Sequence, residues 1–221
     1  MIDHLAGLVP ASLSTTSGRV FYSGRRAFGA PSKLYILGLN PGGCPLEQAS
    51  ETVESHTKMV LSERVDWSAY ANESWKGKPP GTHQMQPRVL HLMHQLQLEP
   101  QQIPASNVIF VRSIRATGLA KRIHELSDLC WPFHQEVIAQ LGVRVVLCFG
   151  KVCGQIVCEK LKVKNRVDKF VEKNNRRWVS EAFMNTDGFA VIIATHPSIA
   201  DWTAPATDPS QLVQRILARV D

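Results

Sequence analysis

The chain has 221 residues, 44% hydrophobic and 20% charged, a composition typical of a folded water-soluble protein. The length favours one domain over residues 1–221, and no apolar run approaches the ~18 residues of a membrane span, so we expect no membrane contact. Five cysteines are not typical of a disulfide framework and the N-terminus lacks a secretory pattern, so we expect a cytoplasmic protein, which we take to be a monomer.

The net charge of +6 is concentrated in one segment, residues 160–180. Eight basic and two acidic side chains lie there, so this segment alone accounts for the whole excess. Clustered positive charge attracts a polyanion and steers its approach. The alternative interpretation is a solvated basic connector over about residues 160–180.

Four short apolar runs predict β-strands, at Leu34–Leu39, Val108–Val111, Val143–Phe149 and Ala190–Ala194. Their hydrophobicity is continuous, which is typical of strands covered on both faces, as in a parallel sheet. Helices are expected at Ser127–Leu141, at Lys151–Leu161 and over residues 207–220, where Thr207 or Asp208 is the expected cap. This alternation predicts an α/β fold, a three-layer α/β/α sandwich with a central, mainly parallel four-stranded sheet.

Two strand-end loops are candidate functional sites, because ligands of such sheets bind beyond the carboxyl ends of the strands. The first loop, residues 38–43, follows the first strand and carries Asn40 beside a proline and glycines. The second loop, residues 195–198, follows the fourth strand and carries His196 beside a proline. Proline fixes the backbone, so each loop holds one polar side chain at a strand end.

Together these loops resemble the two signature motifs of the uracil-DNA glycosylase superfamily. LYILGLNPGG is similar to its Gly-x-Asn-Pro-Gly motif, and ATHPS is similar to its His-Pro-Ser motif. The segments NVIFVRS, CWPF and VRVVLCFGKVC resemble the middle of the family, so the resemblance extends from about Leu34 to Trp202. It implies a uracil-DNA glycosylase-like fold. It also implies a monofunctional DNA glycosylase that hydrolyses the N-glycosidic bond of a flipped uracil-type base and leaves an abasic site.

The resemblance also implies roles for single residues. Asn40 would orient the attacking water through its amide oxygen, and His196 would stabilise negative charge on O2 of the leaving base. Ser198 would hold the second motif or bind a phosphate. The residues expected around the substrate are Gly38, Leu39, Pro41, Gly42, Arg112, Ser113 and Ser198.

Arg112 departs from the family pattern. Several branches read the base with an asparagine at the end of the second strand, and the matching position here is Arg112. Arginine is a donor only, so it cannot read a donor and an acceptor of uracil as an amide does. Either the register of that strand is off by one, or the pocket takes another base, such as an oxygen-rich modified cytosine. A grip on a phosphate or a carboxylate is the alternative role.

DNA contacts are expected on the surrounding loops. The family carries an inserting wedge residue four places beyond the histidine, which is Ala200 here, so Ile199 and Trp202 are the candidates. A Trp202 buried under the loop is the alternative. A base-stacking ring is expected from Trp67, Tyr70 or Trp75. Phosphate contacts are expected from Lys121, Arg122, Lys169, Lys173, Arg176 and Arg177.

No metal and no cofactor are expected. The iron–sulfur branch of the family needs four cysteines with an early close pair, and only Cys44 precedes Cys130 here. His91 and His94 have helical spacing but no further ligands in the sequence. Residues 121–124 resemble the basic loop of a covalent branch, whose histidine would be His124, and coincidence is the favoured interpretation.

Two rival functions stay open from the sequence. One is a glycosylase that removes a bulky modified cytosine from phage DNA, as an anti-phage defence. The other is a module of the same fold that binds damaged or single-stranded DNA without turnover. Assays of base release separate these possibilities.

Overall fold

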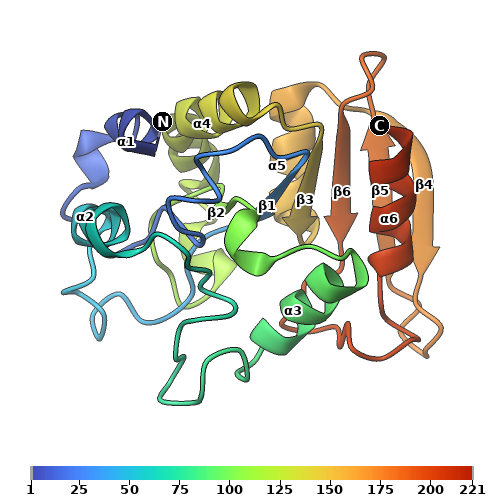
Figure 1. The fold of residues 1–221 in the computed structure, drawn as a ribbon, viewed down its shortest axis with the longest axis horizontal. Coiled ribbons are helices and arrows are strands. Elements are labelled where there is room, and N and C mark those ends of the chain that lie inside the picture. Colours follow the sequence, from blue (N-terminus) through green and yellow to red (C-terminus); the bar gives the residue numbers. More distant parts are fainter. Residues whose placement is uncertain (1, 221) are drawn as a thin grey trace.

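The computed structural model describes residues 2–220, and of Ala116 only the backbone. Six strands of this part of the chain form one mixed sheet in the order β2-β1-β3-β6-β5-β4 (Figure 1). The parallel strands are β1 (Leu34–Gly38), β2 (Ala105–Asn107), β3 (Val145–Phe149) and β6 (Ala190–Ala194). An antiparallel hairpin of β4 (Asn165–Val171) and β5 (Val179–Met184) extends the sheet beyond β6.

Helices cover both faces of the sheet, as the alternation of elements predicts (Figure 1). One face packs against α4 (Ile123–Leu141) and α5 (Lys151–Leu161), and the other against α3 (Gln86–Gln95) and α6 (Ser210–Arg219). Two more helices, α1 (Ile2–Gly7) and α2 (Val53–Glu63), complete the side of α4. None of the helices in residues 2–220 combines the length and the apolar character that a membrane crossing requires.

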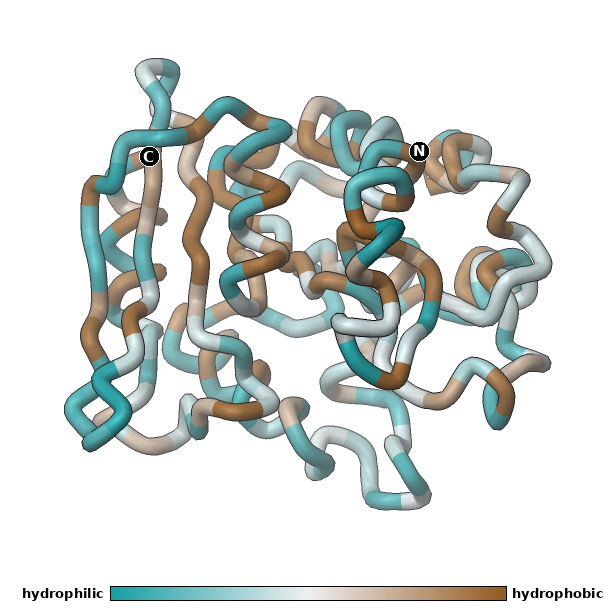
Figure 2. Tube along the Cα trace, turned by 180° about the vertical axis from the view of Figure 1, so that it is seen from behind, coloured by the Kyte–Doolittle hydropathy of each residue, from teal (hydrophilic) through white to brown (hydrophobic). Residues whose placement is uncertain are grey.

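Each central strand is buried on both faces. On β1, Tyr35 and Leu37 pack on the α4 and α5 side, while Leu34 and Ile36 pack on the α3 and α6 side. Continuous apolar sequence is therefore what these strands need. In Figure 2 the central strands are mainly hydrophobic, whereas β4 at the outer edge is mainly hydrophilic.

The sheet differs from the prediction in its size. Four strands were predicted and the sheet has six, because residues 160–180 do not form a connector. They contain the end of α5, all of β4, a turn and the start of β5. The prediction missed these strands because β4 is exposed along one side and its sequence is polar, whereas the other strands were recognised by continuous apolar residues.

The second strand lies earlier than predicted. A strand is expected over Val108–Val111, but β2 ends at Asn107. The first two backbone N–H groups of the predicted run donate to the carbonyls of Gly38 and Leu39, both at 2.9 Å. In a β-ladder successive N–H groups point to opposite edges, so two consecutive donors to β1 end the strand pattern although the run stays buried.

Helix ends also differ from the sequence prediction. α4 begins at Ile123 and not at Ser127, whose hydroxyl donates to the His124 carbonyl (2.9 Å) inside the helix. α6 begins at Ser210, and the Asp208 carboxylate accepts a hydrogen bond from the Ser210 backbone N–H (2.8 Å). Asp208 lies just before α6 and therefore provides the carboxylate that caps this helix.

The direction of the strands defines one edge of the sheet, here called the site edge. The carboxyl ends of β1, β2, β3 and β6 meet there, at the lower side of Figure 1. β5 is antiparallel to both β6 and β4, so β4 runs in the same direction as β6. The turn between β4 and β5, residues 172–178, therefore also lies at the site edge; we call it the hairpin tip.

A buried histidine joins α4 to the sheet. His134 lies between Tyr35, whose hydroxyl is 2.9 Å from Nδ1, and the Val108 carbonyl, 3.2 Å from Nε2. Since a carbonyl only accepts, Nε2 carries the proton and Nδ1 accepts from the tyrosine. Burial lowers the pKa of His134 to about 4, so the ring is neutral at pH 7.

We expect this histidine to make the stability of the protein fall in weak acid. The pKa of His134 is about 4 in the folded protein and about 6.5 in an unfolded chain, so between these values the unfolded state binds the extra proton. The free energy of unfolding should then fall more steeply in the parent than in His134→Gln. The difference should approach 1.4 kcal/mol per pH unit.

Urea unfolding between pH 7 and pH 4.5 measures this difference. His124→Gln, an exposed histidine of the same helix, is the control, and parallel curves for parent and His134→Gln would contradict the assignment.

Candidate active site

The loop after β1 fixes the amide of Asn40 in one orientation. Its Nδ2 lies 2.9 Å from the Pro41 carbonyl, 3.2 Å from the Val111 carbonyl and 2.8 Å from Ser113 Oγ. The Ser113 hydroxyl donates to the Arg115 carbonyl (2.9 Å), so its oxygen is available as an acceptor for Asn40. All donors of the amide are thus bound by protein. Oδ1 accepts no hydrogen bond from the described residues and is left as a fixed acceptor at the site edge.

The loop after β6 fixes the ring of His196. Nδ1 accepts the backbone N–H of Ser198 (3.0 Å) and lies 2.8 Å from its hydroxyl, so the proton of the ring is on Nε2. Burial lowers the pKa of His196 to about 4, and the ring is neutral at pH 7. Ser198 therefore holds the histidine, one of the two roles expected for it. The ring offers a single free donor, Nε2–H.

The His196 loop is held by contacts from three directions. Gly150, at the end of β3, has φ +87° and lies beneath the ring, with the nearest ring carbon 3.4 Å from where a Cβ would be. From α3, Arg88 donates to the Pro197 carbonyl (2.6 Å). From the hairpin tip, Arg176 donates to the Ile199 carbonyl (3.0 Å). Together these contacts fix the position of the loop relative to the sheet.

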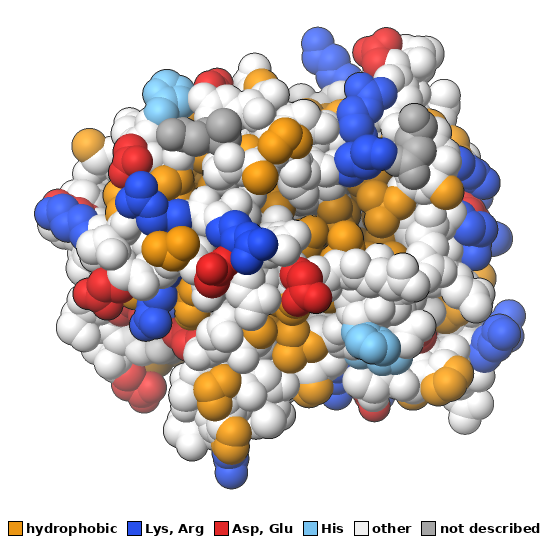
Figure 3. All heavy atoms as spheres, viewed as in Figure 1, with side chains coloured by type: hydrophobic (Ala, Val, Ile, Leu, Met, Phe, Trp, Pro, Cys, Tyr) orange, Lys and Arg blue, Asp and Glu red, His pale blue; other side chains and the backbone are white. Residues whose placement is uncertain are grey.

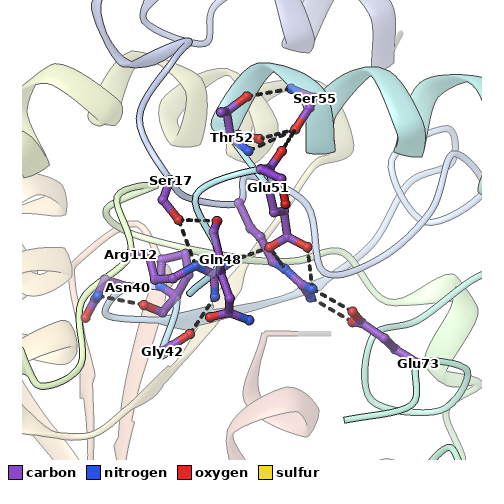
Figure 4. Close-up of polar contacts among 12 residues, drawn as sticks. Ser17, Asn40, Gly42, Gln48, Glu51, Thr52, Ser55, Glu73 and Arg112 are labelled. Carbon is purple, nitrogen blue, oxygen red and sulfur yellow. Dashed lines mark hydrogen bonds and ion pairs between the residues drawn. The ribbon is translucent and has the colours of Figure 1, made fainter. Parts of the chain in front are cut away.

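All three side-chain nitrogens of Arg112 are bound by protein, which argues against its expected role as the base reader. Its side chain is 3% exposed. Nε donates to Ser17 Oγ (3.2 Å), Nη1 to the Gly42 carbonyl (2.6 Å) and Nη2 to the Glu51 carboxylate (Figure 4). The alternative role expected from the sequence, an ion pair with a carboxylate, is the one that the structure shows.

Arg112 belongs to a group of four partly buried charges, Arg19, Glu51, Glu73 and Arg112, here called the charge tetrad; Figure 4 labels Glu51, Glu73 and Arg112. Arg19 binds Glu51 (2.5 Å) and Glu73 (2.6 Å), and Glu51 also binds Arg112. Burial disfavours the charged form of Glu51, but Arg19 and Arg112 outweigh it and hold the pKa of that carboxylate below its ordinary value. Two positive and two negative charges balance, so no charge of the group is left uncompensated in this partly buried place.

Local structure brings Glu51 to this position. Glu51 precedes Thr52, which caps α2 in a reciprocal pair with Ser55 (2.9 and 3.1 Å; Figure 4). The first turn of α2 thereby orients the carboxylate toward Arg112. On the other side Gly43 has φ +117°, and a Cβ there would collide with the Gln48 side chain. This backbone therefore favours glycine at Gly43, next to the Gly42 carbonyl that Arg112 binds.

Asn107 is the site residue that the sequence prediction missed. It ends β2 beside Gly38, is buried, and packs so closely on Gly38 that a Cβ there would collide with it. Its Nδ2 has no hydrogen-bond partner in the described part of the chain, although the Tyr22 phenol lies beside it. The signal was present in the sequence as the asparagine preceding VIFV. The predicted strand ends at Val111, four residues beyond the end of β2, so the strand-end position was expected at Arg112 and not at Asn107.

A chain of aromatic rings joins the polar groups. Tyr22 contacts Tyr70 (ring centroids 6.0 Å apart), Tyr70 contacts Phe149 (6.3 Å), and Phe149 at the end of β3 contacts His196 (6.2 Å). Trp75 also packs on Tyr70 (6.1 Å) and is half-buried, so it is the remaining stacking candidate at the surface. Trp67 packs instead against His56, away from this chain of rings.

The wedge candidates divide in two. Trp202 is fully buried and donates from Nε1 to the Thr195 carbonyl (3.0 Å), so it supports the loop and is not a wedge. Ala200 is also buried. Ile199 is 54% exposed and stays a candidate.

The expected phosphate contacts lie in two separate places. Lys121 and Arg122 are exposed on the segment after β2, where Arg122 pairs with Glu125 (3.1 Å). Lys173, Arg176 and Arg177 lie on the hairpin tip, at the site edge, and Lys169 lies along β4. Of the other basic residues of the run, Lys160 is on α5, Lys162 and Lys164 lie between α5 and β4, and Arg166 is at the far end of β4. Figure 3 accordingly shows basic side chains spread around this face of the molecule, without one continuous patch.

No group of three or more His, Cys, Asp or Glu side chains within residues 2–220 has the arrangement of a metal site. His91 pairs with Asp208 (3.0 Å), which gives it a structural partner. Burial raises the pKa of the Cys130 thiol to about 12, so that thiol is not a reactive thiolate.

Neither the protein-family models nor the curated proteins include a match to this chain. The chemistry of the site therefore follows from its own geometry. Asn40, Asn107, Phe149 and His196 stand at the ends of four adjoining parallel strands, with one free acceptor, one unpaired amide and one free donor among them.

We expect Arg112→Met to lower the free energy of unfolding by about 3 kcal/mol, because it leaves a partly buried carboxylate without one of its cations. Denaturant unfolding measures it. Arg122→Met is a matched control, since Arg122 pairs with Glu125 in the open and its removal should change little. Equal effects of the two substitutions would show that the tetrad does not hold the loop.

Proposed function

We propose that the protein is a monofunctional DNA glycosylase that removes a flipped uracil-type pyrimidine and leaves an abasic site. The observation that carries this proposal is the pair Asn40 and His196, held at the ends of β1 and β6 with only β3 between them. One presents a fixed acceptor and the other a fixed neutral donor. Hydrolysis of an N-glycosidic bond needs both, one for the water and one for the leaving base.

Asn40 orients the nucleophile in this mechanism. Its Oδ1 accepts a hydrogen bond from a water and directs that water toward C1′ of the sugar. An amide does not take the proton as a carboxylate would. The bond to the base therefore breaks largely before the water adds, and the sugar passes through an oxocarbenium-like state.

His196 stabilises the base as it leaves. Nε2–H donates to O2 of the pyrimidine, where negative charge develops. Because its pKa is about 4, the ring does this in its neutral form throughout the physiological pH range. Loss of one such donor costs about 10²–10³ in rate in other enzymes.

Asn107 reads the base, in place of Arg112. Nδ2 is buried in the structure and has no hydrogen-bond partner among the described residues, so in this proposal the amide becomes accessible when the base enters; Nδ2 then donates to O4 of uracil and Oδ1 accepts the N3–H. The rings of Tyr70, Trp75 and Phe149 provide the apolar surroundings of the base. An arginine at the reading position was the reason to consider a bulky modified cytosine, and all three donor groups of Arg112 are bound elsewhere. Uracil is thus the favoured substrate.

The target base must leave the helical stack to reach Asn107, because a stacked base exposes neither its glycosidic bond nor its edge to the protein. Ile199 is the candidate to fill the vacated space. Lys121, Arg122 and the basic residues of the hairpin tip bind phosphates on the two sides of the site.

We expect Asn40→Ala to lower the single-turnover rate of uracil release by about 10²-fold or more while DNA affinity is kept. Alkali-sensitive breakage of a uracil-containing oligonucleotide measures release, and fluorescence anisotropy measures binding. Asn165→Ala removes an exposed amide at the opposite edge of the sheet and serves as the control. DNA binding without release of uracil or of any modified base by the parent protein would favour the non-catalytic module.

A second variant tests the base reader. Asn107→Asp replaces the Nδ2 donor by an acceptor, so O4 of uracil loses its partner and the 4-amino group of cytosine gains one. Release of uracil should fall relative to release of cytosine. Both are measured on the same oligonucleotide series under single-turnover conditions. An unchanged ratio would place Asn107 outside the pocket.

A further inference from the structure

The hairpin tip is joined to the His196 loop. Its Arg176 donates to the Ile199 carbonyl (3.0 Å), and Ile199 N–H in turn donates to the His196 carbonyl (3.0 Å). A second hydrogen bond runs from the backbone N–H of Lys173 to the Ala206 carbonyl (2.8 Å). The tip is therefore in a defined place beside the candidate active site.

The tip carries an exposed aromatic ring among positive charges. Trp178 is 36% exposed, and the Arg176 guanidinium lies over its ring, 4.8 Å from the ring centroid. Lys173 and Arg177 are exposed on the same turn and form no ion pair within the described chain. An indole with a guanidinium on one side and free cations nearby has the composition of a surface that binds single-stranded nucleic acid.

Other loops of the site edge also expose apolar side chains. Leu46 is 88% exposed on the loop after β1, Ile114 is 68% exposed on the segment after β2, and Ile199 lies on the loop after β6. Phosphates do not favour such groups, whereas the faces of bases do. In an intact duplex those faces are hidden by stacking, so this edge suits unpaired nucleotides.

We propose that the hairpin tip is a stacking platform for an unpaired nucleotide that flanks the flipped base. The base of that nucleotide stacks on the part of the Trp178 ring that the Arg176 guanidinium leaves exposed, and Lys173 and Arg177 neutralise the adjoining phosphates. The chemical complementarity to a polyanion with exposed π-faces selects single-stranded DNA as the occupant. This inference rests on the proposed function for the place of the flipped base, but the platform itself needs no catalysis.

The test uses an oligonucleotide of thymidines without uracil, so that binding is measured apart from base release. Trp178→Ala should weaken binding of the single strand about 5-fold or more, and Trp178→Phe should restore most of it. Quenching of indole fluorescence on binding should be smaller in Trp178→Phe than in the parent, since the other four tryptophans remain. Val167→Ala is the matched control, because Val167 on β4 is exposed to the same degree, 36%, away from the tip.

A second measurement tests the charges of the tip. Replacing Lys173 and Arg177 together by glutamine should lower the slope of log K against log salt by about 0.7 for each phosphate of a single strand that these side chains neutralise in the parent. The control pair, Lys162 and Lys164, carries the same charge between α5 and β4, at the opposite edge of the sheet. Replacing that pair should leave the slope unchanged.

The outcomes separate this inference from the proposed function. Uracil release together with normal single-strand binding by Trp178→Ala would overturn the platform and leave the glycosylase standing. Trp178-dependent binding of the single strand without release of any base would support the platform and overturn the glycosylase. If Trp178→Ala weakened binding of a duplex of the same length as much as binding of the single strand, the tip would be a phosphate-binding surface and the stacking platform would be wrong.

Discussion

Arg112 satisfies all its donor groups inside the protein, and this constrains the rest of the site. It connects Ser17, Gly42 of the first loop and Glu51 before α2, three segments that are distant in sequence. A buried guanidinium separated from its carboxylate is costly, so these segments keep their relative positions. The backbone of Ser113 then donates to the Pro41 carbonyl (3.1 Å), and its hydroxyl accepts from Asn40. The orientation of one amide thus depends on a charge pair that touches no substrate.

Hydrogen bonds fix the orientation of both polar groups of the candidate site, the Asn40 amide and the His196 ring. Asn40 has its donors bound and its acceptor free, whereas His196 has its acceptor bound and its donor free. Neither group needs to turn or titrate before a reaction, which is the condition under which fixed dipoles lower a barrier most. The low pKa of His196 follows from the same burial that fixes its ring.

Residues buried on both faces could be recognised from sequence. β1, β3 and β6 lie within the predicted apolar runs, α5 has the predicted limits, and both strand-end loops are at the site edge. The hairpin of β4 and β5 was missed because half-exposed strands carry polar residues and lack that signal. Asn107 was missed for a finer reason. A buried apolar run does not show which of its residues pair with β1, since pairing depends on backbone hydrogen bonds to Gly38 and Leu39. The partners of Arg112 also lie far from it in sequence, so no local pattern indicates them.

The two outer edges of the sheet are protected in different ways. On the β2 side the N-terminal segment covers the edge, where Phe21 bridges to Ser106 and Tyr22 N–H donates to the Ala105 carbonyl (2.9 Å). On the other side β4 pairs only with β5 among the described strands, so its outer edge has no strand partner there, although Arg219 donates to the Val167 carbonyl (3.2 Å). Such an open edge is a template for the strand of another copy, and charged side chains along it oppose that pairing. Arg166, Asp168 and Lys169 on β4 are charged residues of the kind that oppose such pairing between molecules, independently of what the neighbouring tip binds.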